Sequence, residues 1–192
     1  MNYAFRLADI SDSEEILNIY APYIRDTYIS FETEVPSVSE FARRIETICR
    51  QYPFIVCLVE DKIIGYAYAS KHRERAAYCY SVDVSIYVLP EYHGSGTAYK
   101  LYEYLFYILK ELGYYSAYAA VVVPNDRSIC FHQKFGFSVI GTFQKAGYKF
   151  GKWLDVIWLE KAIKSYDKEP GAVKSMNELS VDCFNWENCD EF

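Results

Sequence analysis

The chain has 192 residues, of which 52% are hydrophobic, so it can form one globular domain with a sizeable core and is not a disordered chain. The formal net charge of −6 is unevenly spread, because residues 165–192 contain seven acidic and two basic residues. The remaining body is nearly neutral, which argues against nucleic-acid binding, since that function needs a basic surface.

Residues 1–12 lack the apolar core of a signal peptide, and no apolar run is long enough to cross a membrane, so we expect no membrane partner. The six cysteines show no close pairing, which favours a reduced, cytoplasmic protein. Three scattered histidines without ligand spacing predict no metal site.

The first half of the chain predicts a strand at 4–8, followed by a helix whose apolar residues repeat up to Ile24, with a kink or break at Pro22. Residues 27–34 read as an irregular connector. A second helix at 40–51 follows a cap at Ser37 or Ser39. Residues 54–60 and 63–70 form a hairpin, and the charged connector 71–75 follows it. Such a run is usually a solvated loop, but here it adjoins the central strand.

The centre of the chain combines two periodicities. Residues 78–88 alternate as a strand, and the apolar residues from Ala98 to Leu112 recur at helical spacing until Gly113 ends the helix. The turn between them contains only small residues at 94–98. Free amide groups at a helix N-terminus favour an anion, most often phosphate. A tight loop that merely needs glycine is the alternative, and these residues alone leave both open.

The second half of the chain predicts a strand at 115–123, a helix at 127–135, and strands at 137–143 and 150–159 joined by the link 145–152. The order βααβββαβαββ predicts a fold that combines helices and strands (α/β, in the α+β arrangement). Its sheet should be mixed, with helices on both faces. We assign this domain to residues 1–164 and treat residues 165–192 as an appended acidic tail.

Two blocks of the sequence resemble the GNAT superfamily of N-acetyltransferases. The segment His93-Gly94-Ser95-Gly96-Thr97-Ala98 is similar to its acetyl-CoA motif Gln/Arg-x-x-Gly-x-Gly/Ala, with His93 as the departure. Residues 125–137 resemble its Asn-x-x-Ala-x-x-Leu-Tyr-x-Lys-x-Gly-Phe segment. Further markers across residues 3–162 resemble the phosphinothricin/methionine sulfone acetyltransferase branch; they include Ser30-Phe31-Glu32, Arg73-x-Arg75-Ala76-Ala77-Tyr78, Ser81-Val82-Asp83-x-Ser85-Ile86-Tyr87-Val88 and Gly147-x-Lys149-x-Gly151-x-Trp153-x-Asp155-Val156.

The resemblance implies the GNAT fold, a homodimer, and direct transfer of an acetyl group from acetyl-CoA to the primary amine of a small amino-acid-like substrate in a ternary complex. Two alternatives stay open. One is a GNAT enzyme acting on a polyamine, an aminoglycoside or a protein N-terminus. The other is a non-catalytic acyl-CoA sensor. The pair Arg73 and Arg75 favours an acidic small molecule over a polycation.

The resemblance also assigns roles to residues. Asp83 is the candidate base, one methylene shorter than the glutamate of the family, which favours a water relay. Its structural alternative is a carboxylate that orders neighbouring backbone or pairs with an arginine. His132 is the second catalytic candidate, with a helix histidine bonded to a carbonyl as the alternative. The alternative role of Phe31 is core packing, and that of Asn125 is a helix cap. The expected cofactor contacts are Ile86, Tyr87, Val88, Gly94, Ser95, Gly96, Thr97, Ala98 and Asn125, and the expected substrate contacts are Phe31, Arg73 and Arg75.

Overall fold

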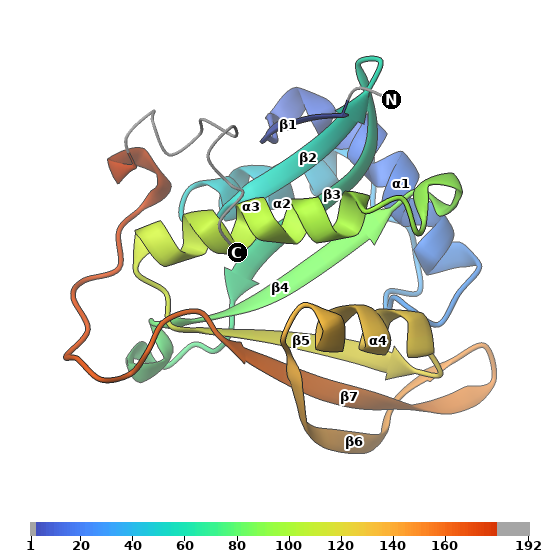
Figure 1. Ribbon diagram of the computed structural model, residues 1–192. Coiled ribbons are helices and arrows are strands. Elements are labelled where there is room, and N and C mark those ends of the chain that lie inside the picture. The colour runs from blue at the N-terminus through green and yellow to red at the C-terminus, as the bar shows by residue number, and fades with distance from the viewer. Residues whose placement is uncertain (1–2, 180–192) are drawn as a thin grey trace.

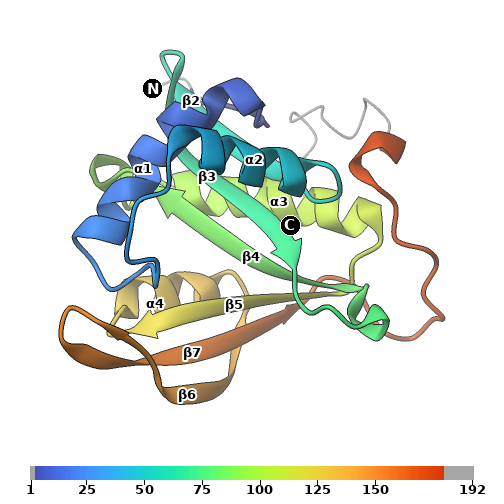
Figure 2. The same cartoon turned by 180° about the vertical axis from the view of Figure 1, so that it is seen from behind.

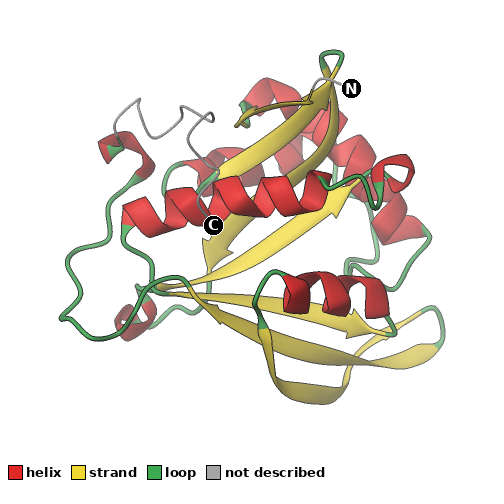
Figure 3. Cartoon of the chain, in the orientation of Figure 1, coloured by secondary structure: helices red, strands yellow, loops and turns green. Residues whose placement is uncertain are grey.

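The structure, a computed structural model, describes residues 3–179. Its strands and helices follow the predicted order βααβββαβαββ, which is confirmed (Figures 1 and 3). The elements are β1 (Tyr3–Leu7), α1 (Ser13–Arg25), α2 (Val38–Cys49), β2 (Phe54–Val59), β3 (Lys62–Lys71), β4 (Ser81–Val88), α3 (Thr97–Leu112), β5 (Ser116–Val123), α4 (Asp126–Lys134), β6 (Ser138–Lys149) and β7 (Lys152–Ala162).

One sheet of seven strands, in the order β1-β2-β3-β4-β5-β7-β6, runs through the molecule. Neighbouring strands are antiparallel except β4 and β5, which are parallel because α3 connects them as a crossover. That parallel pair is short: only residues 81–83 of β4 pair with residues 116–118 of β5. Beyond these residues the two strands diverge, as Figure 1 shows below α3.

Helices cover both faces of the sheet, as predicted: α3 and α4 lie in front in Figure 1, and α1 and α2 cover the face seen in Figure 2. The alternation of β4 divides its side chains between the two layers. Val84 and Val88 pack with Leu105 of α3, whereas Tyr87 packs with the aromatic cluster around Tyr66 beneath α1 and α2.

The long helix α3 follows its predicted apolar stripe, and Gly113 ends it in the left-handed region at a φ of 99°. One polar position differs from expectation. Glu103, which the pattern assigns to the solvent side, is 7% exposed and lies 3.0 Å from the ammonium group of Lys100.

Two sequence boundaries are wrong, and one predicted interruption is absent. The helix α1 continues through Pro22 to Arg25, so of the kink or break expected there the break does not occur. Residues 76–78 form the short 3-10 helix η2 (Ala76–Tyr78), so the central strand begins at Ser81 and not at residue 78. The predicted link 145–152 belongs mostly to a hairpin that turns at Phe150 and Gly151.

The hairpin of β6 and β7 is longer than the sequence composition suggests, and side-chain packing across its strands explains why. Its glycines and lysines favour a loop, but the rings of Tyr148 and Trp153 face each other across the strands at 5.3 Å between centroids. Such cross-strand aromatic pairs stabilise a hairpin beside its turn.

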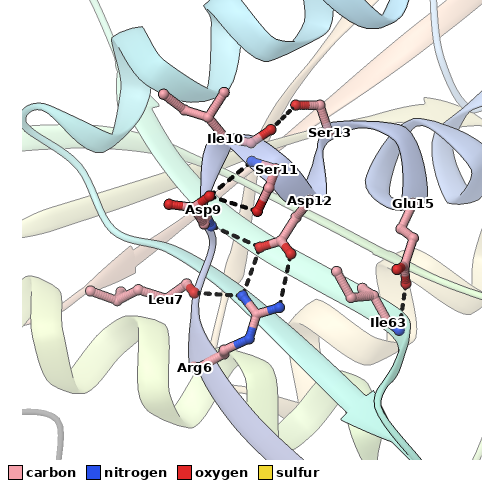
Figure 4. A network of polar contacts seen from close by, with 9 residues as sticks. All are labelled: Arg6, Leu7, Asp9, Ile10, Ser11, Asp12, Ser13, Glu15 and Ile63. Carbon is pink, nitrogen blue, oxygen red and sulfur yellow. Dashed lines mark hydrogen bonds and ion pairs between the residues drawn. The ribbon is translucent and has the colours of Figure 1, made fainter.

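A polar network attaches the start of α1 to the sheet (Figure 4). Arg6 of β1 donates from both terminal nitrogens to the carboxylate of Asp12, at 2.6 and 2.8 Å. The carboxylate of Glu15 accepts a hydrogen bond from the amide of Ile63 on β3 at 3.1 Å. These contacts fix the direction of α1, whose far end reaches the candidate site.

The segment after β7 returns to the domain. The amide of Lys174 donates to the carbonyl of Leu112 at 2.8 Å, and Val173, Met176 and Leu179 pack against the main core. The rest of the predicted acidic tail, residues 180–192 with Cys183 and Cys189, lies outside the described residues. Within residues 3–179, no helix has the length and apolar character needed to cross a bilayer.

Candidate active site

The divergence of β4 from β5 leaves one edge of β4 open. The amide of Leu89 donates to the carbonyl of Ile64 at 2.8 Å, toward β3. Because N–H and C=O groups of successive strand residues point to opposite edges, those of Val84, Ile86 and Val88 point toward β5, where no strand among residues 3–179 pairs with them. The sheet therefore offers the backbone groups of Val84 and Ile86 and the amide of Val88 to an extended ligand, while side chains bond the Val88 carbonyl.

A cleft of about 580 Å³ borders this open edge and extends to the turn before α3 and to α4. It brings together seven of the nine predicted cofactor contacts, namely Ile86, Tyr87, Val88, Gly94, Gly96, Ala98 and Asn125. The other two, Ser95 and Thr97, do not line the cleft. Their hydroxyl oxygens lie 2.7 Å apart, and the Ser95 hydroxyl donates to the carbonyl of Tyr92 at 2.7 Å, so they shape the turn from within.

The turn presents backbone amides to the cleft. Gly94 and Gly96 have φ values of 83° and 90°, which favour glycine, and a Cβ atom on either would meet no heavy atom within 4 Å. Among residues 3–179, no hydrogen-bond acceptor serves the amides of Gly94, Gly96, Ala98 and Tyr99. The 16-residue helix α3 adds the positive end of its dipole. Such free amides fit the diphosphate of acetyl-CoA.

His93, the departure from the family motif, contacts the protein backbone. Its Nε2 lies 3.0 Å from the carbonyl oxygen of Val88, and its Nδ1 lies 2.5 Å from a guanidinium nitrogen of Arg127. Because arginine only donates, Nδ1 accepts and Nε2–H donates to Val88. The hydroxyl of Tyr23 also donates to this carbonyl, at 2.5 Å. The sequence did not indicate Tyr23 or Arg127, because they approach β4 from α1 and α4.

His132 lines a second cavity, of about 70 Å³, at the point where β4 and β5 diverge. Its Nδ1–H donates to the carbonyl of Ser128 at 2.8 Å, and its Nε2 accepts from the hydroxyl of Tyr102 at 3.0 Å. Burial lowers the pKa of His132, so the neutral ring is favoured. The carbonyl-bonded alternative is thus present, yet the Tyr102–His132 pair also borders the cavity next to the open edge.

Asn125 serves two purposes. Its side chain accepts a hydrogen bond from the amide of Ser128 at 3.3 Å and caps α4, as the alternative interpretation proposed. The residue also lines both cavities.

Asp83 lies at the closed end of the gap, in the last pair that joins β4 to β5. Its carboxylate Oδ1 is 2.6 Å from Nδ1 of His72, and not paired with an arginine. Burial raises the pKa of Asp83, while the hydrogen bond from His72 and the charge of Arg73 act in the opposite direction.

The sequence reasoning missed His72, although strand register could have found it. Ser70 of β3 lies opposite Asp83, so His72 is the next residue on the same face, in the diagonal position.

The three predicted substrate contacts lie outside both cavities. The guanidinium carbon of Arg73 is 5.4 Å from the centroid of the Trp158 ring, beside the His72–Asp83 pair, and Arg75 is exposed at the start of η2. Phe31 is 38% exposed and covers Gly147, where a Cβ atom would approach its ring to 2.5 Å.

The connector that carries Phe31 is anchored by a buried lysine. Lys149 of β6 donates to the carbonyls of Ile24 and Ser30 at 2.7 and 2.6 Å, and burial lowers its pKa. A predicted irregular segment is therefore held in one conformation.

Comparison with known proteins agrees with this geometry. Residues 5–158 match the acetyltransferase (GNAT) domain family. The chain is 33% identical over 156 residues to the phosphinothricin N-acetyltransferase of Streptomyces coelicolor, covering 79% of this chain and 91% of the relative. It is 27% identical over 162 residues to an L-methionine sulfoximine/L-methionine sulfone acetyltransferase of Pseudomonas aeruginosa, covering 83% and 94%.

A solved structure is similar in fold and sequence. The phosphinothricin acetyltransferase of Sinorhizobium meliloti, crystallised with acetyl-CoA, superimposes with a TM-score of 0.85 at 33% identity, covering 89% of this chain and 94% of that one. With the open edge of β4 and the free amides before α3, these matches establish that the chain belongs to the GNAT family and is an acetyl-CoA-dependent acetyltransferase.

Proposed function

We propose that the protein acetylates the primary amine of a small amino-acid-like molecule of the phosphinothricin or methionine sulfone/sulfoximine type. The observation that carries this proposal is the half-buried Asp83–His72 pair at the closed end of the gap, with Arg73 beside it. Asp83 supplies a base for an ammonium group, and Arg73 offers a guanidinium fork to a carboxylate. The names of the relatives from Streptomyces and Pseudomonas support the same substrate class.

The chain's own residues account for each proton. Asp83 takes one proton from the ammonium through a water, which frees the lone pair that the C–N bond requires. The amide N–H of Val88 points into the gap and donates to the oxygen that gains charge as the thioester carbon is attacked. The C–S bond breaks with its electron pair on sulfur. Tyr102 and His132 are the proposed donor pair there: the Tyr102 hydroxyl gives its proton to the thiolate and takes the second amine proton in exchange.

The cofactor side follows from backbone geometry. The free edge formed by Val84, Ile86 and the amide of Val88 suits the amide groups of the pantetheine arm, and the turn at Gly94–Ala98 suits the diphosphate. In the proposed ternary complex the amine reacts directly with acetyl-CoA.

A thiol-release assay tests the proposal. Acetyl-CoA is supplied with phosphinothricin, methionine sulfone and methionine sulfoximine, and in parallel with a polyamine, an aminoglycoside and a peptide with a free N-terminus. We expect turnover with the amino-acid analogues and intersecting initial-velocity lines, as a ternary complex requires. Turnover confined to the polyamine, aminoglycoside or peptide would contradict the substrate class, and acetyl-CoA binding without any turnover would contradict the chemistry.

A homodimer is part of the proposal. The edge strand β6 exposes Val139, Ile140 and Phe143, by 45, 48 and 54%, and Trp153 on β7 is 63% exposed. An apolar edge of this kind favours a second copy as its cover. Sedimentation of the wild type and of Phe143→Glu checks this, and a monomeric wild type would contradict it.

The proposal also includes a cytoplasmic location and a domain boundary near residue 164. The four described cysteines are free thiols, which supports a cytoplasmic protein. The family match ends at residue 158 and β7 ends at Ala162, which supports a transferase domain ending near residue 164.

A further inference from the structure

His72 contacts the proposed base from a neighbouring strand. It directly follows β3, and its Nδ1 lies 2.6 Å from Oδ1 of Asp83. The His72 side chain is 8% exposed, whereas that of Asp83 is 31% exposed. The histidine is therefore the inner member of the pair, and the carboxylate is the member that solvent or a substrate reaches.

Three aromatic side chains hold the His72 ring. It stacks on Tyr118 of β5 at 4.2 Å between centroids with 16° between planes, and it meets the edges of Tyr78 at 5.7 Å and of Trp158 on β7 at 6.2 Å. A ring in contact with three separate elements keeps one orientation, with Nδ1 toward Asp83.

The short distance assigns the proton. Two lone pairs at 2.6 Å would repel each other, so one proton lies between the two atoms. Nδ1–H therefore donates to the Asp83 carboxylate, and Oδ2 stays available as a proton acceptor. This bond also favours the charged carboxylate, which opposes the effect of burial.

We propose that His72 is a positioning residue for the transfer reaction, which fixes the Asp83 carboxylate and keeps it ionised so that Oδ2 receives the amine proton. The inference rests on the proposed function. His72 keeps its Nδ1 proton throughout, so it relays nothing. Its role matters more for an aspartate than for a longer side chain, because an aspartate on a strand reaches the gap only in a restricted orientation.

The other groups around Asp83 do not replace this bond. Arg73 affects the carboxylate through its charge alone, which lowers the pKa of Asp83. The Tyr118 and Tyr78 rings contact His72 itself. His72 is thus the side chain whose removal changes the hydrogen bonding of the carboxylate.

Two substitutions separate positioning from packing. His72→Asn provides an amide N–H close to the place of Nδ1–H, and His72→Phe keeps an aromatic ring without a donor. With saturating acetyl-CoA and methionine sulfone, we expect His72→Phe to lower kcat about ten- to a hundredfold, as loss of a hydrogen bond to a charged group predicts. The acidic limb of its pH profile should move to higher pH. We expect His72→Asn to recover most of the rate and the wild-type limb. The affinity for acetyl-CoA should not change in either variant.

The control is Glu74→Gln. Glu74 is an exposed residue of the same connector, and its carboxylate pairs with Lys71. Equal losses in His72→Asn and His72→Phe, or an unshifted pH profile in His72→Phe, would overturn the proposal.

A measurement on the wild-type protein does not depend on whether the variants fold. The ¹⁵N shifts of His72 should report the Nδ1–H tautomer, and this preference should be lost in Asp83→Ala, which removes the acceptor. An Nε2–H tautomer in the wild type would overturn the inference. A wild type that turns over none of the amines would instead refute the proposed function, while the tautomer still tests the pair.

Discussion

The two sides of the reaction centre are built from different materials. The proposed cofactor side consists of backbone: the open edge of β4 and the free amides of Gly94, Gly96, Ala98 and Tyr99, which lie close together in sequence. The proton-accepting side consists of side chains from β3, β4, β5 and β7, joined by the contacts of His72 with Asp83, Tyr118 and Trp158. A site made of backbone groups tolerates a change of side chain but not a change of φ. A site made of side chains instead loses function when a single donor or acceptor atom is removed.

The largest effect that this comparison predicts is the loss of the base. Asp83→Asn should lower kcat by about a hundred- to ten-thousandfold, the usual contribution of general base catalysis, because an amide cannot accept the amine proton. The affinity for acetyl-CoA should be unchanged, since the backbone of the cleft is untouched. Steady-state kinetics and a CoA titration measure both. Asp61→Asn in the exposed β2–β3 turn is the control. An equal loss of rate and affinity would assign Asp83 a structural role.

Gly96→Val tests the cofactor side. A β-branched residue at a φ of 90° costs about 1–3 kcal/mol in strain, and its side chain enters the open cleft in front of the amides. We expect the dissociation constant of CoA to rise at least about tenfold, in keeping with 1.4 kcal/mol per factor of ten. Calorimetry checks this against Gly171→Val, which has a permissive φ and open space around its Cβ position. Unchanged affinity in Gly96→Val would exclude this turn as the diphosphate site.

Gly147→Ala tests the connector that carries Phe31. The new methyl group would lie 2.5 Å from a ring carbon of Phe31, so the ring and its connector must shift. We expect the free energy of unfolding to fall by about 1–3 kcal/mol, as overpacking does. The KM of the amine should rise roughly three- to tenfold, as misplaced substrate contacts do, with CoA affinity retained. Thermal unfolding and kinetics measure these quantities. Gly141→Ala, with no atom near its Cβ position, is the control. If KM stays the same, Phe31 serves packing and not the substrate.

The smallest effect concerns pH. In the proposed mechanism the ionised form of Asp83 is the active form, so activity should be present above its pKa and be lost as the pH falls through it. The charge of Arg73 lowers this pKa, by less than the His72 bond does. In Arg73→Gln the acidic limb of kcat/KM should therefore move to higher pH, by less than in His72→Phe. A limb that moves to lower pH would contradict the arrangement. A large rise in the KM of the amine would add a carboxylate contact to the role of Arg73.

The sequence by itself determined the order of the elements, the two helical layers and the turn at residues 94–98. These are local or periodic features: alternation in β4, the 3.6-residue stripe of α3 and small residues at positive φ leave marks in neighbouring positions. The alternation also placed Asp83 within a strand, and the resemblance to the GNAT family made it the candidate base.

Only the tertiary structure decided what Asp83 contacts and how the strands separate around it. His72 is adjacent to Asp83 through strand register, Tyr23 and Arg127 reach the end of β4 from two helices, and Lys149 reaches Ile24 across 125 residues. Composition suggested a loop at 145–152, yet cross-strand packing made it a hairpin. The physical reason is the same in each case: packing and hydrogen bonds between distant segments depend on distances in space, and these leave no period along the chain.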